Sequence, residues 1–145
     1  MKSIAKAALV LALISLFAGC ATSGPKFTEF KPTAVELNPD SGRIYIYRTA
    51  VLGAAVQPEI KVNGVVVGKA VPNGFFYVDK SRGDYEISAS TEVERKLSLT
   101  LDKGQTRYVR MNISMGFFVG HVYPELIDNE TAQKEIQNCH YIGKQ

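Results

Sequence analysis

From Arg43 onward, hydrophobic and polar residues alternate along this chain with a period of two, which is the pattern of a β-strand. In the first such segment, residues 43–48, two isoleucines share one face and two tyrosines share the other: Ile44 and Ile46, then Tyr45 and Tyr47. Because both faces are apolar, we expect this strand to lie in the interior of its sheet rather than at an edge.

Further alternating segments follow, separated by turns that contain glycine. The turns are Asn63-Gly64, Pro72-Asn73-Gly74, Arg82-Gly83-Asp84 and Asp102-Lys103-Gly104. An Asn-Gly pair between two alternating segments is the strongest short hairpin signal, because both turn residues must tolerate positive φ. One later segment places three leucines on one face, which we expect to point inward: Leu97, Leu99 and Leu101. This spacing predicts a mainly β protein, an antiparallel β-sandwich of about seven to eight strands.

Near the C-terminus the pattern becomes helical. Asp128 or Asn129 can cap a helix, and Glu130 falls in its favourable first turn. Three apolar residues share one helical face: Ala132, Ile136 and Cys139. The sequence therefore predicts a short C-terminal helix that turns the Cys139 thiol towards the sheet.

The first twenty residues have the features of a secretory signal peptide. Lys2 and Lys6 are followed by an apolar core of about eleven residues, shorter than the roughly 20 that a membrane-spanning helix needs. The run 16–20, Leu-Phe-Ala-Gly-Cys, resembles a bacterial lipobox, in which the cysteine receives lipid and becomes the new N-terminus. The alternative is an ordinary cleaved signal that leaves a soluble periplasmic protein. Ala21 after the cysteine suggests export to the outer membrane rather than retention in the inner one.

These features divide the chain into three parts. Residues 1–19 are predicted to be the signal peptide, and residues 20–42, which carry three prolines, the lipidated N-terminus and tether. Phe27 and Phe30 interrupt the tether and are candidates for docking on the domain. Residues 43–145 are predicted to form the β-sandwich domain with its C-terminal helix.

Charge and composition narrow the classes of partner. Removal of Lys2 and Lys6 with the signal peptide lowers the formal net charge from +3 to +1. A near-neutral domain without a basic run argues against a nucleic-acid partner. It also argues against purely electrostatic binding to anionic membranes. The expected partners are the membrane, through the lipid on Cys20, and an envelope protein or a glycan.

The residues able to do covalent or metal chemistry are few. With Cys20 lipidated, Cys139 is the remaining thiol, and we expect it to be buried. Cys139 and His140 are adjacent, so on a helix their side chains diverge by about 100°, and no spacing forces His121 near either. Glu92 and Glu94 are interpreted as a solvated strand end. The sequence thus predicts no catalytic residue, no metal site and no cofactor.

Two apolar segments do not fit the pattern, namely 49–56 and 115–123. Each can be a buried strand, or an exposed patch of the kind that marks a partner or membrane surface. The tyrosine face of the first strand is a third such surface. Together these give the candidate partner surface: Tyr45, Tyr47, Phe117, Phe118, Val119 and His121.

Several short motifs resemble a family of bacterial lipoproteins with no assigned activity, known as domain of unknown function 2846. The motifs are residues 42–48 (Gly-Arg-Ile-Tyr-Ile-Tyr-Arg), Val62-Asn63-Gly64, Val67-Gly68, Gly74-Phe75-Phe76 and Gly83-Asp84-Tyr85. The middle of the region, residues 59–90, is also similar to PEGA-type β-modules of envelope proteins. The resemblance implies a fold and a location, and it carries over no catalytic residue.

The sequence as a whole predicts a non-catalytic module, anchored by lipid at the outer membrane and facing the periplasm. Its predicted role is to bind or scaffold an envelope protein or a glycan. An accessory subunit of a transport or secretion assembly is the second interpretation. A thiol or carboxylate hydrolase is the third, and it requires a cleft that brings His121 near Cys139 or a carboxylate.

Overall fold

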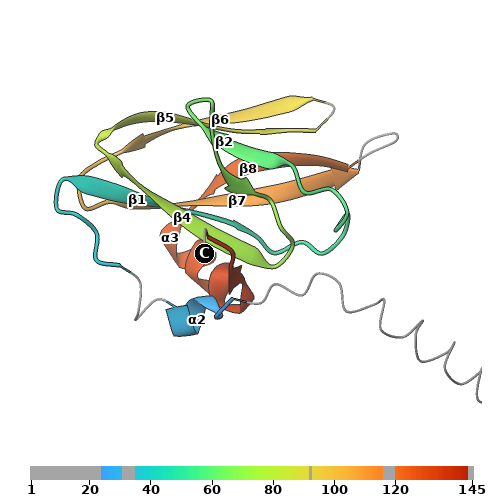
Figure 1. Ribbon diagram of the computed structural model, residues 1–145, viewed down its shortest axis with the longest axis horizontal. Helices are drawn as coiled ribbons and strands as arrows, with labels where there is room; N and C mark the ends of the chain where they lie inside the picture. The colour runs from blue at the N-terminus through green and yellow to red at the C-terminus, as the bar shows by residue number, and fades with distance from the viewer. Residues whose placement is uncertain (1–23, 31–34, 92, 116–119, 144–145) are drawn as a thin grey trace, which may run out of the picture.

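A computed structural model of the protein describes residues 24–30, 35–91, 93–115 and 120–143 (Figure 1). Within these residues the fold is mainly β, as predicted. The strands are β1 (Ser41–Arg48), β2 (Glu59–Val62), β3 (Val65–Lys69), β4 (Gly74–Ser81), β5 (Gly83–Ser90), β6 (Glu94–Leu101), β7 (Thr106–Met115), β8 (Gly120–Ile127) and β9 (His140–Tyr141). The helices are α2 (Phe27–Phe30), α3 (Asn129–Glu135) and the 3-10 turn η3 (Ile136–Asn138).

The strands form two sheets that pack face to face. One sheet has the order β8-β7-β1-β4-β9 and the other β3-β2-β5-β6. The predicted sandwich is therefore confirmed, and β1 is the central strand of its sheet. The prediction that it is antiparallel was wrong for two pairs, because β1 pairs with β7 and β4 with β9 in parallel. Alternating hydrophobicity sets which face of a strand is buried, but it does not set the direction of a partner distant in sequence.

The five-stranded sheet is covered on both faces, which gives three layers (Figure 1). Its inner face packs on the four-stranded sheet, and the buried residues of this core include Ile44, Ile46, Ile60, Ile87, Leu101, Val109 and Met111. Leu99 and Leu101 are buried, so the predicted inward face of β6 is confirmed. On the outer face, α2, α3 and η3 cover the tyrosines of β1.

The N-terminal segment 24–30 belongs to this outer layer. The Phe27 ring is buried and makes edge-on contacts with Tyr45 and Phe75, and the Phe30 ring stacks on Tyr141 with centroids 4.2 Å apart. The docking considered for Phe27 and Phe30 is confirmed. The predicted tether of residues 20–42 therefore requires correction, because its described part from Gly24 to Phe30 is packed into the domain, and β1 begins at Ser41.

Two local predictions are confirmed by backbone geometry. Asn63 and Gly64 join β2 and β3 with φ of 47° and 79°. The Asp128 side chain caps α3 by accepting a hydrogen bond of 2.9 Å from the Thr131 amide. The helix is shorter than expected, because it gives way to the 3-10 turn at Ile136, and Cys139 follows that turn while remaining buried.

Candidate functional site

The most unusual side chain of the domain is an arginine with no exposed surface at the end of β1. All five N–H donors of the Arg48 guanidinium are used, each on a main-chain carbonyl. The acceptors are Ala50 (3.0 Å), Leu52 (3.0 Å), Gly53 (3.0 Å), Val56 (2.6 Å) and Ala70 (2.9 Å). The side chain therefore ties the β1–β2 connection to the β3–β4 turn.

The charge of Arg48 is balanced by dipoles rather than by an anion. Among the described residues no carboxylate forms an ion pair with Arg48, and burial lowers the pKa of its guanidinium. A buried charge is tolerated when hydrogen bonds replace its hydration shell. The five carbonyl oxygens supply that replacement and are fixed in position by it.

Four of the five carbonyls, all but that of Ala70, belong to the first of the two apolar segments that do not fit the alternating pattern. It forms the loop Thr49–Pro58, which we name the apolar loop; it contains no charged residue. Val51 and Leu52 at its tip are 59% and 65% exposed. For this segment the exposed-patch interpretation is thus correct and the buried-strand interpretation is wrong. Gly53 has φ +68°, and a β-carbon there would lie 2.4 Å from Ile113, so the tip requires glycine.

The second apolar segment, residues 115–123, overlaps the end of β7 and the beginning of β8. Met115 ends β7, and Gly120 begins β8, in which Val122 is fully buried. Phe117, Phe118 and Val119, which belong to the predicted partner surface, lie outside the described residues. His121 is half-buried, and its Nδ1 lies 3.4 Å from Thr91 Oγ1.

Two other members of the predicted partner surface require correction. Tyr45 and Tyr47 are only 6% and 1% exposed, because α2, α3 and η3 cover the outer face of β1. Their hydroxyl-bearing face is therefore an internal layer and not a contact surface. The predicted lipid attachment residue, Cys20, lies outside the described residues.

The thiol and the histidines do not form a catalytic pair in this fold. Cys139 is 1% exposed, its Sγ lies 3.8 Å from the Arg48 carbonyl oxygen, and burial raises its pKa to about 12. His140 instead donates from Nδ1 to the Gly24 carbonyl oxygen at 2.7 Å. His121 lies on β8, two strands or about 10 Å from β1. The described residues contain no cluster of three or more His, Cys, Asp and Glu able to hold a metal ion.

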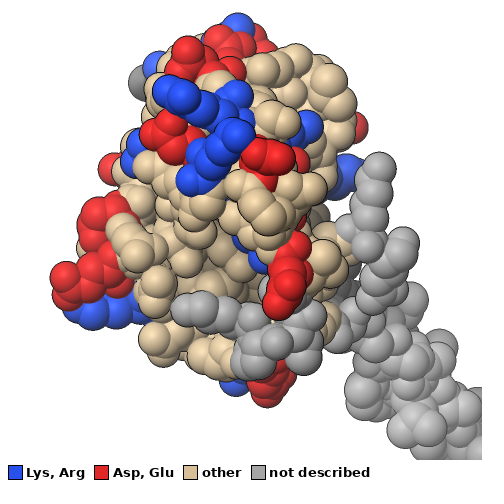
Figure 2. Space-filling model, turned by 90° about the vertical axis from the view of Figure 1, so that its left-hand side faces the viewer, with Lys and Arg blue, Asp and Glu red and all other residues tan. Residues whose placement is uncertain are grey.

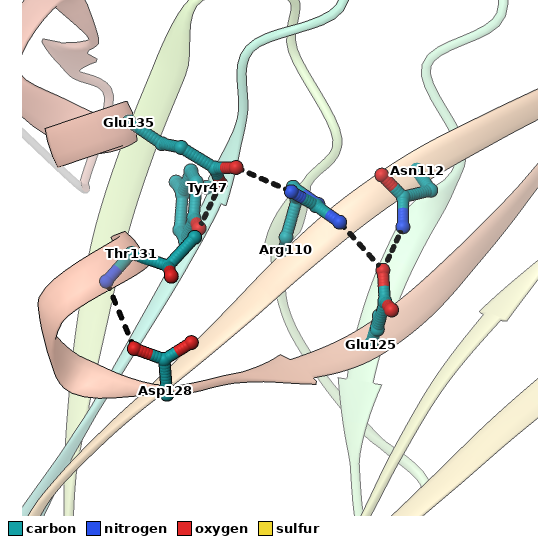
Figure 3. A network of polar contacts seen from close by, with 7 residues as sticks. All are labelled: Tyr47, Arg110, Asn112, Glu125, Asp128, Thr131 and Glu135. Atoms are coloured by element: carbon teal, nitrogen blue, oxygen red, sulfur yellow. Dashed lines mark hydrogen bonds and ion pairs between the residues drawn. The ribbon is translucent and has the colours of Figure 1, made fainter. Parts of the chain in front are cut away.

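A polar network fastens α3 to the sheet (Figure 3). The Tyr47 hydroxyl donates to Glu135 at 2.6 Å, and Arg110 bridges Glu135 (2.5 Å) and Glu125 (2.8 Å). Asn112 donates to the same Glu125 carboxylate. Burial and the Glu135 contact raise the pKa of Tyr47, whereas the Arg110 contact lowers the pKa of Glu125. The network is half-buried and both of its carboxylates are paired, whereas the buried Arg110 Nε has no partner among the described residues; its role is to hold the helix.

Clefts open along both sides of the sandwich. One, of about 360 Å³, lies between the edge strands β6 and β8 and is lined by Arg95, Lys96, Ser114, Tyr123 and Pro124. The other, of about 340 Å³, lies between β3 and the β4–β9 edge, and its lining is mostly apolar and aromatic, including Val66, Phe76 and Tyr141. The first combines cations, a hydroxyl and an aromatic ring, a set suited to a polar ligand.

Sequence reasoning missed the role of Arg48. The residue closes the alternating segment 43–48 and precedes an uncharged loop, and that juxtaposition was the available signal. The role depends on acceptors up to 22 positions away. A period of two cannot reveal such contacts.

Comparison with known proteins gives a family but no activity. A family described as "Protein of unknown function (DUF2846)" matches residues 38–122. An uncharacterized protein of Haemophilus influenzae is 26% identical over 140 residues, which cover 94% of this chain and 83% of that protein. No solved structure matches. Within the described residues, no helix is both long and apolar enough to cross a membrane.

Proposed function

The chain belongs to the DUF2846 family of proteins of unknown function, and we propose that it is a lipid-anchored module that acts by binding at the periplasmic face of the outer membrane. Lipid on Cys20 attaches it, and the module is non-catalytic. The match over residues 38–122 confirms the resemblance to domain of unknown function 2846, whereas the lipoprotein character and the PEGA-like middle region stay predictions.

The apolar loop is the observation that carries this proposal. Single exposed aliphatic residues are common on protein surfaces. Here two adjacent ones stand at the tip of an uncharged loop whose backbone is held by a fully buried arginine. A loop that is fixed from inside and apolar outside is suited to contact with another envelope component. The burial of the Cys139 thiol supports the non-catalytic part of the proposal.

The proposal is tested by the state of the N-terminus and by contact at the loop. We expect the mature protein to begin at Cys20, to carry acyl mass on it, and to fractionate with the outer membrane. A double substitution of Val51→Ser and Leu52→Ser should abolish cellular function while the protein stays folded and anchored. Val65→Ser, at a residue that is 64% exposed in β3, is the matched control. An unlipidated N-terminus, or full function of the double variant, would refute the proposal.

A second candidate is binding of a glycan in the β6–β8 cleft. Tyr123 offers a ring for stacking on a sugar, and Arg95, which forms no ion pair among the described residues, can pair with a carboxylate. Isothermal titration with a soluble peptidoglycan fragment tests it. Arg95→Ala should weaken binding roughly tenfold, whereas Arg82→Ala, at the other end of the sandwich, should leave it unchanged.

A further inference from the structure

We propose that the apolar loop docks on the phospholipid surface of the membrane that carries the anchor, so that the sandwich stands on that membrane by one end. This inference rests on the proposed function, because it uses the lipid on Cys20. It goes further by naming the component that the loop contacts and by fixing the orientation of the domain.

The first argument is that the two ends of the sandwich differ in chemistry. Register places the apolar loop, the β3–β4 turn and the β5–β6 turn at one end, since Arg48 pairs with Gly74 and Ile60 with Ala89. This is the right-hand end in Figure 1. The β5–β6 turn also contains Val93, whose side chain is exposed.

The opposite end carries acidic and basic side chains of both signs, which gather on the face shown in Figure 2. Two ion pairs join its turns: Arg82–Asp102 and Lys103–Asp40. One end therefore presents the uncharged apolar loop, beside the charged start of β6 at Glu94 and Arg95, and the other end presents turns joined by ion pairs. Such a distribution along the strand axis favours an end-on arrangement at an interface between membrane and water.

The second argument is the place where the anchored chain joins the domain. Arg48 pairs with Gly74, and Gly74 pairs with His140 on the next strand. Arg48 on β1 and His140 on β9 are therefore separated by two strand spacings, or about 10 Å. His140 in turn holds the Gly24 carbonyl oxygen. The chain thus enters the fold level with the root of the apolar loop.

The linker is too short to lift that end away from the membrane. Gly24 follows Cys20 by four residues, which span at most about 14 Å when fully extended. The segment from Gly24 cannot act as extra linker, because Phe27 donates its amide to the Cys139 carbonyl at 2.9 Å and its ring is buried. Lipid on Cys20 would therefore keep the apolar end at the bilayer surface.

The third argument is that several carbonyls of the loop are already paired from inside, which lowers the cost of moving the loop out of water. Unpaired main-chain groups are costly in an apolar medium. The carbonyls of Ala50, Leu52, Gly53 and Val56 accept from Arg48, and that of Ala54 accepts from Gln57 at 2.9 Å. Arg48 thus satisfies four loop carbonyls from inside that water would otherwise have to satisfy from outside.

Fluorescence quenching in a reconstituted membrane tests the proposal. The full mature lipidated protein is placed in vesicles of phosphatidylethanolamine and phosphatidylglycerol, with an environment-sensitive dye on Leu52→Cys. Spin-labelled phospholipids in the same vesicles quench the dye if it lies about 5–10 Å below the surface. We expect at least roughly twofold quenching there. The same dye on Lys103→Cys at the charged end should show none.

A second dye position controls for the loss of the Leu52 side chain in the first variant. The dye on Ala54→Cys should be quenched as well, and Leu52→Asp in that protein should reduce the quenching. Val65→Asp should leave it unchanged. Equal quenching at residues 52 and 103, or none at 52 and 54 in protein that floats with the vesicles, would overturn the docking.

The controls separate this inference from the function on which it rests. Protein that lacks acyl mass on Cys20 and fails to float with vesicles would refute the anchor itself. A different outcome would point to a protein partner instead of the lipid surface. In that case the protein floats with the vesicles but residue 52 is not quenched, and in cells with a permeabilised outer membrane residue 52 is shielded from a membrane-impermeant reagent. Quenching confined to residues 52 and 54 supports the lipid surface.

Discussion

The Cys139 thiol lies 3.8 Å from the main-chain carbonyl oxygen of Arg48, although 91 positions separate the two residues. Arg48 thus contacts two parts of the structure, one through its backbone and one through its side chain. Its backbone meets the segment that follows the C-terminal helices, and its side chain holds the apolar loop. A change in the packing of Cys139 therefore bears directly on the strand end from which the loop is built.

Cys139 should be chemically silent in the folded protein. At pH 8, a thiol with a pKa of about 12 has roughly a thousandfold less thiolate than one with the ordinary value of 9.0. Alkylation by iodoacetamide should therefore be at least about a hundredfold slower in native protein than in urea-unfolded protein, as followed by intact mass. Rapid labelling of native protein, together with loss of function in a stably folded Cys139→Ala variant, would make the thiol a site.

The same burial makes the fold sensitive to alkali. The folded pKa of Cys139 is raised from 9.0 to about 12, so native protein keeps a proton that unfolded protein releases. Its contribution to stability is complete below pH 9 and is lost as pH rises towards 12, with a slope of up to about 1.4 kcal/mol per pH unit. Urea titrations between pH 8 and 10 should show a steeper decline for wild type than for Cys139→Ala. Parallel curves would contradict this assignment. Tyr47, whose pKa is also raised, adds to the decline at higher pH.

Loss of the Arg48 side chain should destabilise the domain through its unpaired carbonyls. Arg48→Met should lower the free energy of unfolding by about 2–4 kcal/mol, since a buried group without its partner costs roughly 1–3 kcal/mol and the loop can recover some hydration. The apolar loop should also become the first site of limited proteolysis. Arg95→Met, at an exposed arginine, should change stability by less than about 0.5 kcal/mol. Similar effects of both variants would argue against the loop-organising role.

The β2–β3 turn should tolerate glycine far better than alanine. Gly64 has φ +79°, and a β-carbon there would meet nothing within 4 Å, so the cost of Gly64→Ala is conformational, at about 1–2 kcal/mol. Gly83→Ala is the matched control, because its backbone is not left-handed and its nearest neighbour, Tyr85, is 3.8 Å away. Urea denaturation measures both. A Gly64→Ala protein as stable as wild type would show that the turn adopts another form.

The N-terminal segment should behave as part of the domain. Phe27→Ala should lower the free energy of unfolding by about 3–5 kcal/mol, as expected for a buried aromatic residue. Val35→Ala, at a residue that is 70% exposed, should have little effect. If Phe27→Ala is harmless, residues 24–30 are a tether after all. The linker to the membrane would then be long enough to free the apolar end.

The features that the sequence predicted correctly are those set by near neighbours. Asn63 and Gly64 form a hairpin because a tight turn with positive φ depends only on the turn residues themselves. Asp128 caps α3 because its carboxylate reaches an amide three residues on. Leu99 points inward because alternate residues of a strand face the same side.

The features that required the tertiary structure are contacts between distant residues. The apolar residues on both faces of β1 predicted an inner strand. No local pattern predicts that Phe27 covers Tyr45 on the outer face of that strand. The parallel pairing of β1 with β7 likewise follows from chain path rather than from periodicity.

The apolar loop shows both contributions in one segment. Its composition marked residues 49–56 as unusual and left open whether they were a buried strand or an exposed patch. The tertiary structure decided for exposure, because Arg48 occupies the interior beneath the loop and takes its carbonyls. A buried charge must find acceptors somewhere in the fold. The sequence therefore determined which residues are apolar, and the position of one guanidinium determined which of them face outward.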